Sequence, residues 1–172
     1  KNFMPLYKSG SKLKIKFKLN NKDVSTETDT RILLTDFLRH YVGETGTHVG
    51  CEHGICGACT ILLNGEPIRS CLMFASQLNG QELITIEGLS KDKNFENLKK
   101  AFKKNHALQC GFCTPGFLIT ITAFLNKNPK YADENNIREV LSGNICRCTG
   151  YVGIVEAVKE VIEINKNTQK HV

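Results

Sequence analysis

Two absences in this chain limit what it can do. No apolar run among its 172 residues approaches membrane-spanning length, and a transmembrane helix needs about 20 such residues. We therefore expect no membrane span. The sequence also has no internal repeat, no low-complexity segment, and no paired-carboxylate, phosphate-loop or Ser/His/Asp signature. We therefore expect no catalytic residue in this chain.

The chain is instead rich in cysteine, and its eight cysteines form two sets of four. The first set is Cys51-x4-Cys56-x2-Cys59, completed by Cys71. The second set is Cys110-x2-Cys113, completed by Cys146-x-Cys148. The C-x4-C-x2-C…C spacing is typical of plant-type ferredoxins, which bind a [2Fe–2S] cluster through four thiolates. Two such sets predict an electron-transfer module with two [2Fe–2S] clusters.

Three other interpretations of the cysteines fit the sequence less well. A disulfide framework suits short secreted chains with small cores, whereas this chain is 41% hydrophobic and long enough for ordinary cores. Zinc also binds paired thiolates, but the spacing from Cys51 to Cys59 does not resemble zinc knuckles. A Rieske-type site would use histidine, and three histidines lie near the cysteines, but each set already has four thiols. These histidines are His48, His53 and His106.

Glycines in the first cysteine loop support a cluster site. Gly50, Gly54 and Gly57 are interleaved with its three cysteines. Glycine permits positive φ angles and a close approach of the backbone, which a loop needs in order to point N–H groups at sulfur. We therefore expect these three glycines to form the backbone that surrounds the cluster.

Charge argues against a nucleic-acid partner. The formal charge is +6, from 23 basic and 17 acidic residues. Eight ligating thiolates around two oxidised clusters lower this to about +2, which removes most of the electrostatic attraction to phosphates. The lysines at 12, 14, 16 and 18 alternate with apolar residues, which is typical of the wet face of a half-buried strand. Thiol-ligated clusters favour a reducing compartment, so we expect a cytoplasmic location.

Hydrophobic patterning divides the chain into two parts. The first part predicts an α+β, β-grasp layout with a hairpin, a helix, further strands and a thiol-rich loop. Its expected strands are 13–19, 24–27, 60–63, 68–71 and 83–87, with turns at 20–23 and 64–65 and a helix over 32–41. We place the boundary in the polar stretch 88–94, which gives a ferredoxin-like domain over 1–88. Residues 1–10 are expected to form a flexible arm.

The second part, 89–172, has a helical pattern. Phe95, Leu98 and Phe102 lie on one helical face. Thr114 is expected to cap a helix that has Pro115 at its first position and runs to Pro129. Asp133 is expected to cap a third helix that stops at Gly143, and a fourth covers 154–162. Four helices with cysteines at their junctions predict a small bundle with the second cluster inside. Residues 166–172 are expected to be disordered.

Five motifs in the chain resemble the small iron–sulfur subunit of the molybdenum hydroxylases, which include xanthine dehydrogenase and aerobic carbon monoxide dehydrogenase. The resemblance runs from about residue 13 to 164. The motifs are the segments 50–60 (GCEHGICGACT), 69–75 (RSCLMFA), 85–89 (TIEGL), 108–116 (LQCGFCTPG) and 143–151 (GNICRCTGY).

The resemblance implies partners and an electron route. In this family a large subunit carries the molybdenum–molybdopterin cofactor, a medium subunit carries FAD, and the clusters relay electrons from molybdenum to FAD. By motif position, Gln109 and Cys148 are expected to face the molybdopterin. The resemblance also implies separate subunits, often a dimer of heterotrimers. The alternative is a free-standing two-cluster carrier or redox sensor.

Overall fold

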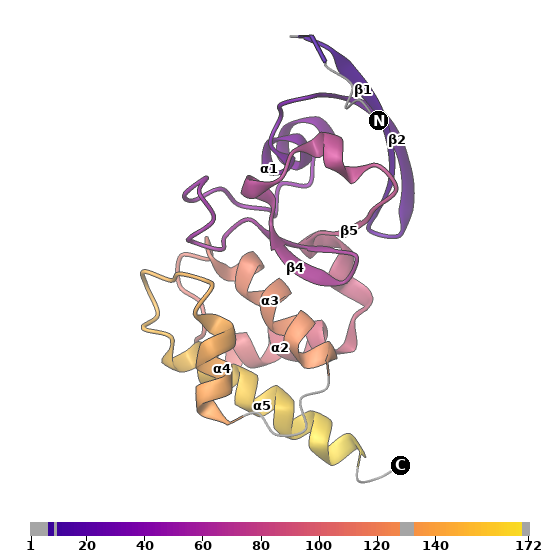
Figure 1. Cartoon of the computed structure of the whole chain (residues 1–172). Helices are drawn as coiled ribbons and strands as arrows, with labels where there is room; N and C mark the ends of the chain where they lie inside the picture. The colour runs from indigo at the N-terminus through magenta and orange to yellow at the C-terminus, as the bar shows by residue number, and fades with distance from the viewer. Residues whose placement is uncertain (1–6, 9, 128–132, 170–172) are drawn as a thin grey trace.

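The computed structural model describes residues 7–8, 10–127 and 133–169. The element order is mixed α/β, with five strands in the first part and most of the helix in the second (Figure 1). Most of the expected arm lies outside the described residues, as do the expected helix end at Pro129 and residues 170–172.

The five strands form one sheet in the order β2-β1-β5-β3-β4. β5 pairs parallel to β1 and antiparallel to β3, whereas the β1–β2 and β3–β4 pairs are antiparallel hairpins. The sheet therefore brings the first and last strands of this part together at its centre. The strands are β1 (Lys12–Leu19), β2 (Lys22–Asp29), β3 (Thr60–Leu63), β4 (Glu66–Arg69) and β5 (Glu82–Ile84).

Both hairpins close through two-residue turns. Asn20 and Asn21 have φ of 52° and 65°, and Asn64 and Gly65 have 51° and 85°. Positive φ at both central residues defines the type I′ turn, which matches the twist of the strands. The first turn is thus shorter than predicted, and Lys22–Asp23 belong to β2.

The four lysines of β1 are exposed, as the alternation predicts. Three of them lie directly opposite an acidic residue of β2 in the register. Opposite charges facing each other across a hairpin are mildly stabilising. This face of the sheet is therefore charge-balanced and not a cationic stripe. The facing pairs are Lys12–Asp29, Lys14–Glu27 and Lys18–Asp23.

Two predicted strands end earlier than expected. β4 ends at Arg69 because the chain turns into a 3₁₀ segment, Ser70–Leu72, which buries Cys71. β5 ends at Ile84 because the Thr85 amide donates to the Asn20 side chain and no longer to a strand. Two further 3₁₀ segments are Ala75–Leu78 and Ile86–Lys91.

The predicted helix over 32–41 is present but is not regular. It begins as α1 (Leu34–Asp36) and continues as a π-helix over Phe37–Val42. Gly43, at φ 90°, ends it by donating its N–H to the Leu38 carbonyl. The buried side of this segment contributes Leu34, Phe37 and Leu38 to the core beneath the sheet.

Four α-helices make up the second part: α2 (Lys93–Lys104), α3 (Thr114–Asn126), α4 (Glu134–Leu141) and α5 (Val152–Gln169). Asp133 caps α4 as predicted, with its carboxylate accepting from the Asn136 amide at 2.8 Å. Thr114 is the first residue of α3 and not its cap, because the turn at Gly111 already leads into the helix at Cys113. The expected disorder from 166 is wrong for Lys166–Gln169, which extend α5.

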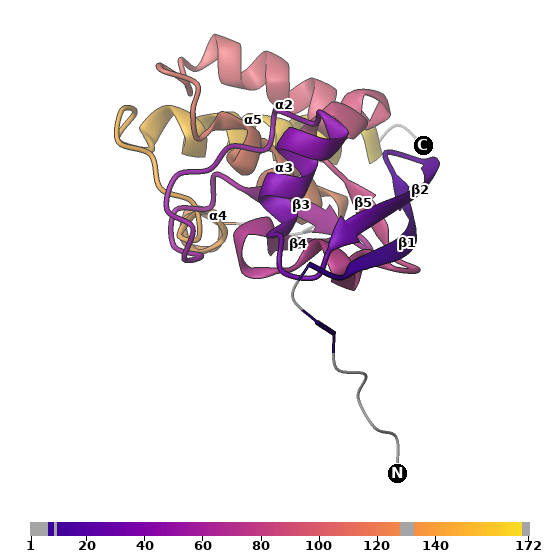
Figure 2. The same cartoon turned by 90° about the horizontal axis from the view of Figure 1, so that it is seen from above.

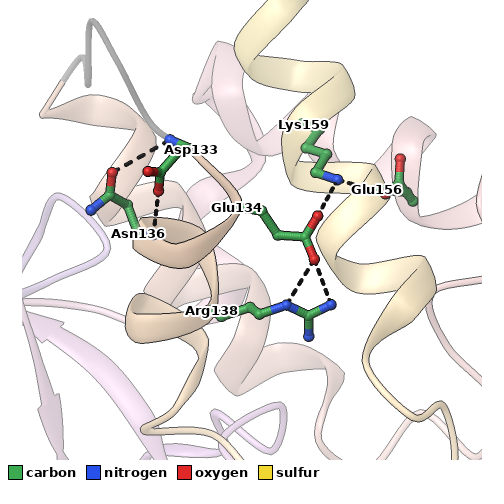
Figure 3. A network of polar contacts seen from close by, with 6 residues as sticks. All are labelled: Asp133, Glu134, Asn136, Arg138, Glu156 and Lys159. Carbon is green, nitrogen blue, oxygen red and sulfur yellow. Dashed lines mark hydrogen bonds and ion pairs between the residues drawn. The ribbon is translucent and has the colours of Figure 1, made fainter.

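Exposed charges join α4 to α5. Lys159 Nζ lies 2.7 Å from a Glu134 oxygen, and Arg138 binds the other oxygen of Glu134 (Figure 3). Asn165 of α5 donates to Asn94 of α2 at 2.8 Å, which ties the extended end of α5 back to the helices. Within the described residues, no helix combines the length and apolarity needed to cross a membrane.

The sheet and the helices share a buried boundary. α3 is mostly buried and packs against β3 and β4 on one side and α2 and α4 on the other (Figure 1). Along β3, Ile61 joins the core of the sheet part while Leu62 joins the helical core. Successive side chains of this strand thus pack into two different hydrophobic cores. The connection between the parts is also packed, since Leu89 is buried among the helices.

Candidate iron–sulfur sites

The first cysteine set is brought together by one loop and one 3₁₀ turn. The loop runs from the end of the π-helix to β3 and carries Cys51, Cys56 and Cys59, while Cys71 follows β4. Cys59 and Cys71 are 2% and 3% exposed, so half of the set is sealed from water. Cys51 Sγ accepts the Cys56 N–H at 3.4 Å.

The second set is assembled from two helix junctions. Cys110 and Cys113 precede α3, and Cys146 and Cys148 precede α5. Cys110 and Cys148 are exposed, and their sulfurs lie 3.5 Å apart. This set therefore lies at the rim of the helices, and not inside them as predicted, because the thiols belong to the loops that enter the helices.

In each set the four cysteines converge. The Cys56 N–H lies 3.4 Å from Cys51 Sγ, and the sulfurs of Cys110 and Cys148 are 3.5 Å apart. Besides burial, Cys59 contributes to the raised pKa of Cys71, and Cys146 to that of Cys113, so these thiols are neighbours as well. All eight thiols are free of disulfides. Among the described residues, no three Cys, His, Asp or Glu side chains converge on a single-ion position.

Four converging thiols per set supply the ligands that a [2Fe–2S] cluster requires. Each of its two irons takes two cysteine thiolates, whereas a zinc site gathers four ligands around one ion. The donor atoms present therefore fit a [2Fe–2S] cluster in both sets.

Burial and local donors divide the thiols by acidity. Hydrogen bonds from the backbone of Cys56 and of His53 lower the pKa of Cys51 to about 6. Burial, together with a hydrogen bond to the Cys59 thiol, raises the pKa of Cys71 to about 11. Burial, together with a hydrogen bond to the Cys146 thiol, raises the pKa of Cys113 to about 12. Cys71 and Cys113 are therefore thiols that resist ionisation, and a bound metal centre would stabilise them because it binds the thiolate form.

Gly57 lies where the two cysteine sets meet. Its φ is 72°, and a Cβ at this position would be 2.5 Å from the Gly143 carbonyl oxygen. Its own carbonyl accepts from the Asn144 side chain at 3.0 Å. Gly54 also has a positive φ, whereas a Cβ on Gly50 would lie 3.0 Å from Cys56 Sγ. The predicted loop glycines therefore allow close backbone approach, and Gly57 does so across the boundary between the parts.

Hydrogen bonds join the ligand loops directly. Ile145, which precedes Cys146, donates its N–H to the Cys56 carbonyl at 2.9 Å. Arg69 reaches from β4 to the Gly143 carbonyl and to the Thr60 hydroxyl. Both views place the first cysteine loop and the 143–151 loop on the same side of the molecule (Figures 1 and 2). The two sets are thus neighbours that are linked through the backbone.

Asn144 is the buried centre of this junction. It is 1% exposed; its amide nitrogen donates to Gly57, and its oxygen accepts from Thr120 of α3 at 3.0 Å. Neither Asn144 nor Arg69 was expected from the sequence to support the sites. Both belong to motifs that carry the resemblance, but their role depends on a contact between segments that are far apart in the chain.

A second contact between the loops involves His48. Its Nδ1 lies 2.7 Å from the Phe112 carbonyl oxygen, and the two rings stack with centroids 4.9 Å apart. Phe112 lies between Cys110 and Cys113, and His48 lies three residues before Cys51. His48 therefore acts as a bridge between loops. His53 bonds the Cys51 carbonyl, and His106 is exposed.

The segment before Cys51 is held from two sides. Arg39 of the π-helix donates to the Thr45 and Thr47 carbonyls at 2.6 and 2.8 Å. On the other side, Glu87 of the 3₁₀ segment Ile86–Lys91 accepts the Gly46 N–H at 2.7 Å. Burial and the nearby Glu87 raise the pKa of Glu44. The structure thus forms a close carboxylate pair, Glu44 and Glu87, which the sequence did not reveal because the two lie in segments that are far apart in the chain.

Gln109 and Cys148 lie side by side. The Gln109 amide donates to the Cys148 carbonyl at 3.1 Å, and both residues are exposed. They sit 39 positions apart in the sequence, so the packing of the helix junctions brings them together. The pair forms an accessible polar edge beside the second set.

Comparison with known proteins supports the cysteine assignment. Residues 16–100 match the model described as a 2Fe-2S iron-sulfur cluster binding domain, and residues 85–159 match the [2Fe-2S] binding domain. The caffeine dehydrogenase subunit gamma of Pseudomonas sp. (strain CBB1) is 49% identical over 149 residues, covering 86% of this chain and 89% of that protein. The nicotine 6-hydroxylase small subunit of Paenarthrobacter nicotinovorans is 50% identical over 147 residues, covering 86% and 88%.

A solved structure agrees. The quinoline 2-oxidoreductase of Pseudomonas putida 86 includes a chain that superposes with a TM-score of 0.84 at 44% identity, covering 91% of this chain and 97% of that one. The chain belongs to the small iron–sulfur subunit family of the molybdenum hydroxylases. Small iron–sulfur subunits of this family are electron-transfer components of oxidoreductase complexes. The predicted family is therefore confirmed.

Proposed function

We propose that this chain holds two [2Fe–2S] clusters and relays electrons within a molybdenum hydroxylase. The observation that carries this proposal is the convergence of four thiols in each set. Bound clusters would supply one-electron centres between a molybdenum–molybdopterin cofactor and FAD, both on partner subunits. Cys51, Cys56, Cys59 and Cys71 would hold one cluster, and Cys110, Cys113, Cys146 and Cys148 the other.

The chain's own residues fix how these two sets relate. The bond from Ile145 N–H to the Cys56 carbonyl and the bond from Asn144 to Gly57 hold the loops together. Backbone N–H groups at Cys51 stabilise its thiolate form, and burial of Cys59 and Cys71 keeps water from half of the first set. We assign the first set, with loop glycines Gly50, Gly54 and Gly57, to a β-grasp ferredoxin domain over 1–88, and the second to a helical domain over 89–172.

The exposed edge at Gln109 and Cys148 supports an order for the electron route. These residues present polar groups at the surface beside the second set, so we propose that they face the molybdopterin of the large subunit. The first set would then deliver electrons to a medium FAD subunit. We further propose a dimer of heterotrimers in the cytoplasm.

Metal analysis of the full chain tests the proposal. We expect about four irons and about four acid-labile sulfides per chain, since each [2Fe–2S] cluster contributes two of each. Zinc in place of iron, or half of the iron with all cysteines intact, would contradict it. Purification from the native source should recover molybdenum and flavin subunits with the chain; a monomer free of both would instead indicate a free-standing carrier.

Electron order is tested separately. In the assembled enzyme, Cys56→Ser should leave substrate able to reduce the second cluster while transfer to FAD stops. Cys113→Ser should stop transfer before either cluster is reduced. Rapid-freeze electron paramagnetic resonance resolves these cases, and the opposite pattern would reverse the proposed order.

A further inference from the structure

The second cysteine set has a hydroxyl hydrogen bond to sulfur. Thr149 Oγ1 lies 3.2 Å from Cys146 Sγ. The same oxygen accepts the Tyr151 N–H at 3.2 Å. A hydroxyl has one proton to donate. Because the Thr149 oxygen is the acceptor for the Tyr151 N–H, its own proton is free to be donated to the sulfur.

Tyr151 locks the loop that carries this bond. Its hydroxyl donates to the Asn144 carbonyl at 3.0 Å and accepts the Cys146 N–H at 2.9 Å. Its φ is 68°, a left-handed conformation that is unusual for an aromatic residue. The ring packs edge-on against Phe117 of α3, with centroids 5.9 Å apart. The loop from 144 to 151 is thus closed on itself, which holds Thr149 next to Cys146.

The first set has no equivalent. Cys51 Sγ accepts a backbone N–H from Cys56 at 3.4 Å. Among the hydrogen bonds of the described residues, no hydroxyl donates to a sulfur of Cys51, Cys56, Cys59 or Cys71. The two sets therefore differ in the kind of donor that surrounds the ligand sulfurs.

We propose that Thr149 sets the reduction potential of the cluster held by the second set, by donating its hydroxyl proton to Cys146 Sγ. This inference rests on the proposed function, because it requires a cluster at these thiols. Hydrogen bonds to ligating sulfurs tune cluster potential. One-electron reduction adds negative charge to the cluster, so the hydroxyl bond strengthens on reduction and raises the potential. Thr149 is a positioning residue in this scheme and not a ligand.

Paired substitutions in the full, cluster-loaded chain test the inference. Thr149→Val removes the hydroxyl and keeps the branched shape, and Thr149→Ser restores the hydroxyl. In a redox titration followed by electron paramagnetic resonance, we expect Thr149→Val to shift the reduction equilibrium of the second cluster about tenfold toward the oxidised form, which is about 59 mV for one electron. Thr149→Ser should titrate close to the unmodified chain.

Two controls isolate the effect. The first cluster of the same molecules should keep its potential in every variant. Thr168 donates to the Ile164 carbonyl on the exposed end of α5, so Thr168→Val should change neither cluster. An unchanged potential in Thr149→Val, or an equal shift in Thr149→Ser, would overturn the inference while leaving the proposed function in place.

Loss of the second cluster in Thr149→Val would still leave a decisive measurement. Thr149→Ala is then titrated in its place. A crystal structure of the cluster-loaded unmodified chain must also keep Thr149 Oγ1 within hydrogen-bonding distance of Cys146 Sγ, and a longer distance would overturn the inference. Failure of the unmodified chain to bind iron would instead contradict the proposed function itself.

Discussion

The two cysteine sets reach a similar arrangement of thiols by different routes. Three cysteines of the first set lie within nine residues of one loop, whereas the second set joins two helix junctions that are more than 30 residues apart. The first set buries Cys59 and Cys71, whereas the second exposes Cys110 and Cys148. A local loop can be shaped mainly by its own glycines, but a set drawn from distant segments depends on the packing of α3 and α5.

This difference matches the distribution of supporting contacts. The first loop is supported by glycines with positive φ and by Arg39 and Glu87 on its approach. The second is supported by side chains, with Tyr151 and Thr149 closing its loop. Asn144 serves both. Mutations in the first set should therefore disturb mainly their own loop, whereas mutations in the second set should also destabilise the helices.

Ligand removal gives the largest expected effect. If each set holds one cluster as proposed, Cys56→Ser and Cys113→Ser should each lower iron content by about half. We expect Cys113→Ser also to lower the thermal midpoint more, because cluster binding is coupled to folding where distant segments are joined. Iron and sulfide assays with far-ultraviolet circular dichroism measure both quantities. An equal loss of stability in the two variants would contradict the proposed difference between the two cysteine sets.

The next largest effect is expected at Gly57. Alanine there would place a Cβ 2.5 Å from the Gly143 carbonyl oxygen in a residue at φ 72°, and we expect a loss of about 3 kcal/mol in unfolding free energy. Gly65 is the matched control, since its φ is 85° but no atom lies within 4 Å of the position that an alanine methyl group would take. Gly65→Ala should cost about 1 kcal/mol, the left-handed penalty alone. Urea unfolding measures both, and equal losses would show that crowding between the loops is unimportant.

Asn144→Ala should have an intermediate effect. It leaves the Gly57 carbonyl and the Thr120 hydroxyl without their buried partner, and an unsatisfied buried group costs about 1–3 kcal/mol. Asn135, exposed on α4 and without a side-chain hydrogen bond among the described residues, provides a control that should stay within about 0.5 kcal/mol when changed to Ala. Both cluster signals should broaden or weaken in the Asn144 variant. Disturbance of the second cluster alone would argue against a shared junction.

The smallest effect is expected in the exposed network of charges between α4 and α5 (Figure 3). Hydrogen bonds from Lys159 and then Arg138 lower the pKa of Glu134. A carboxylate whose pKa is lower in the folded state stabilises the protein above its unfolded pKa, and this contribution is lost as pH falls through the folded pKa.

Glu134→Gln should therefore lower the thermal midpoint slightly at neutral pH, and the difference should shrink at high salt and below about pH 4. Differential scanning calorimetry checks this. Glu163 on α5 is an exposed carboxylate for which the described contacts include no ion pair, so Glu163→Gln should leave the midpoint unchanged. A salt-independent loss in Glu134→Gln would point to packing instead of charge.

The sequence alone determined the features that arise from local spacing. Alternation along 12–19 specified β1, Asn64-Gly65 specified a hairpin turn, and Asp133 specified the start of α4. These succeed because periodicity, turn chemistry and capping act between residues within one element. Cysteine spacing likewise identified both sets and, through the motifs, the family.

Only the tertiary structure decided how distant residues meet. The ends of β4 and β5 and the extension of α5 involve bonds to other elements, such as those of Ser70 to Cys59, Thr85 to Asn20 and Asn165 to Asn94. The roles of Asn144, Thr149 and Tyr151 likewise follow from the folded loop, since no pattern in the sequence indicates which polar atom a buried amide or hydroxyl contacts. Spacing therefore identified the two cysteine sets, whereas packing between the sheet and α3 placed their loops side by side.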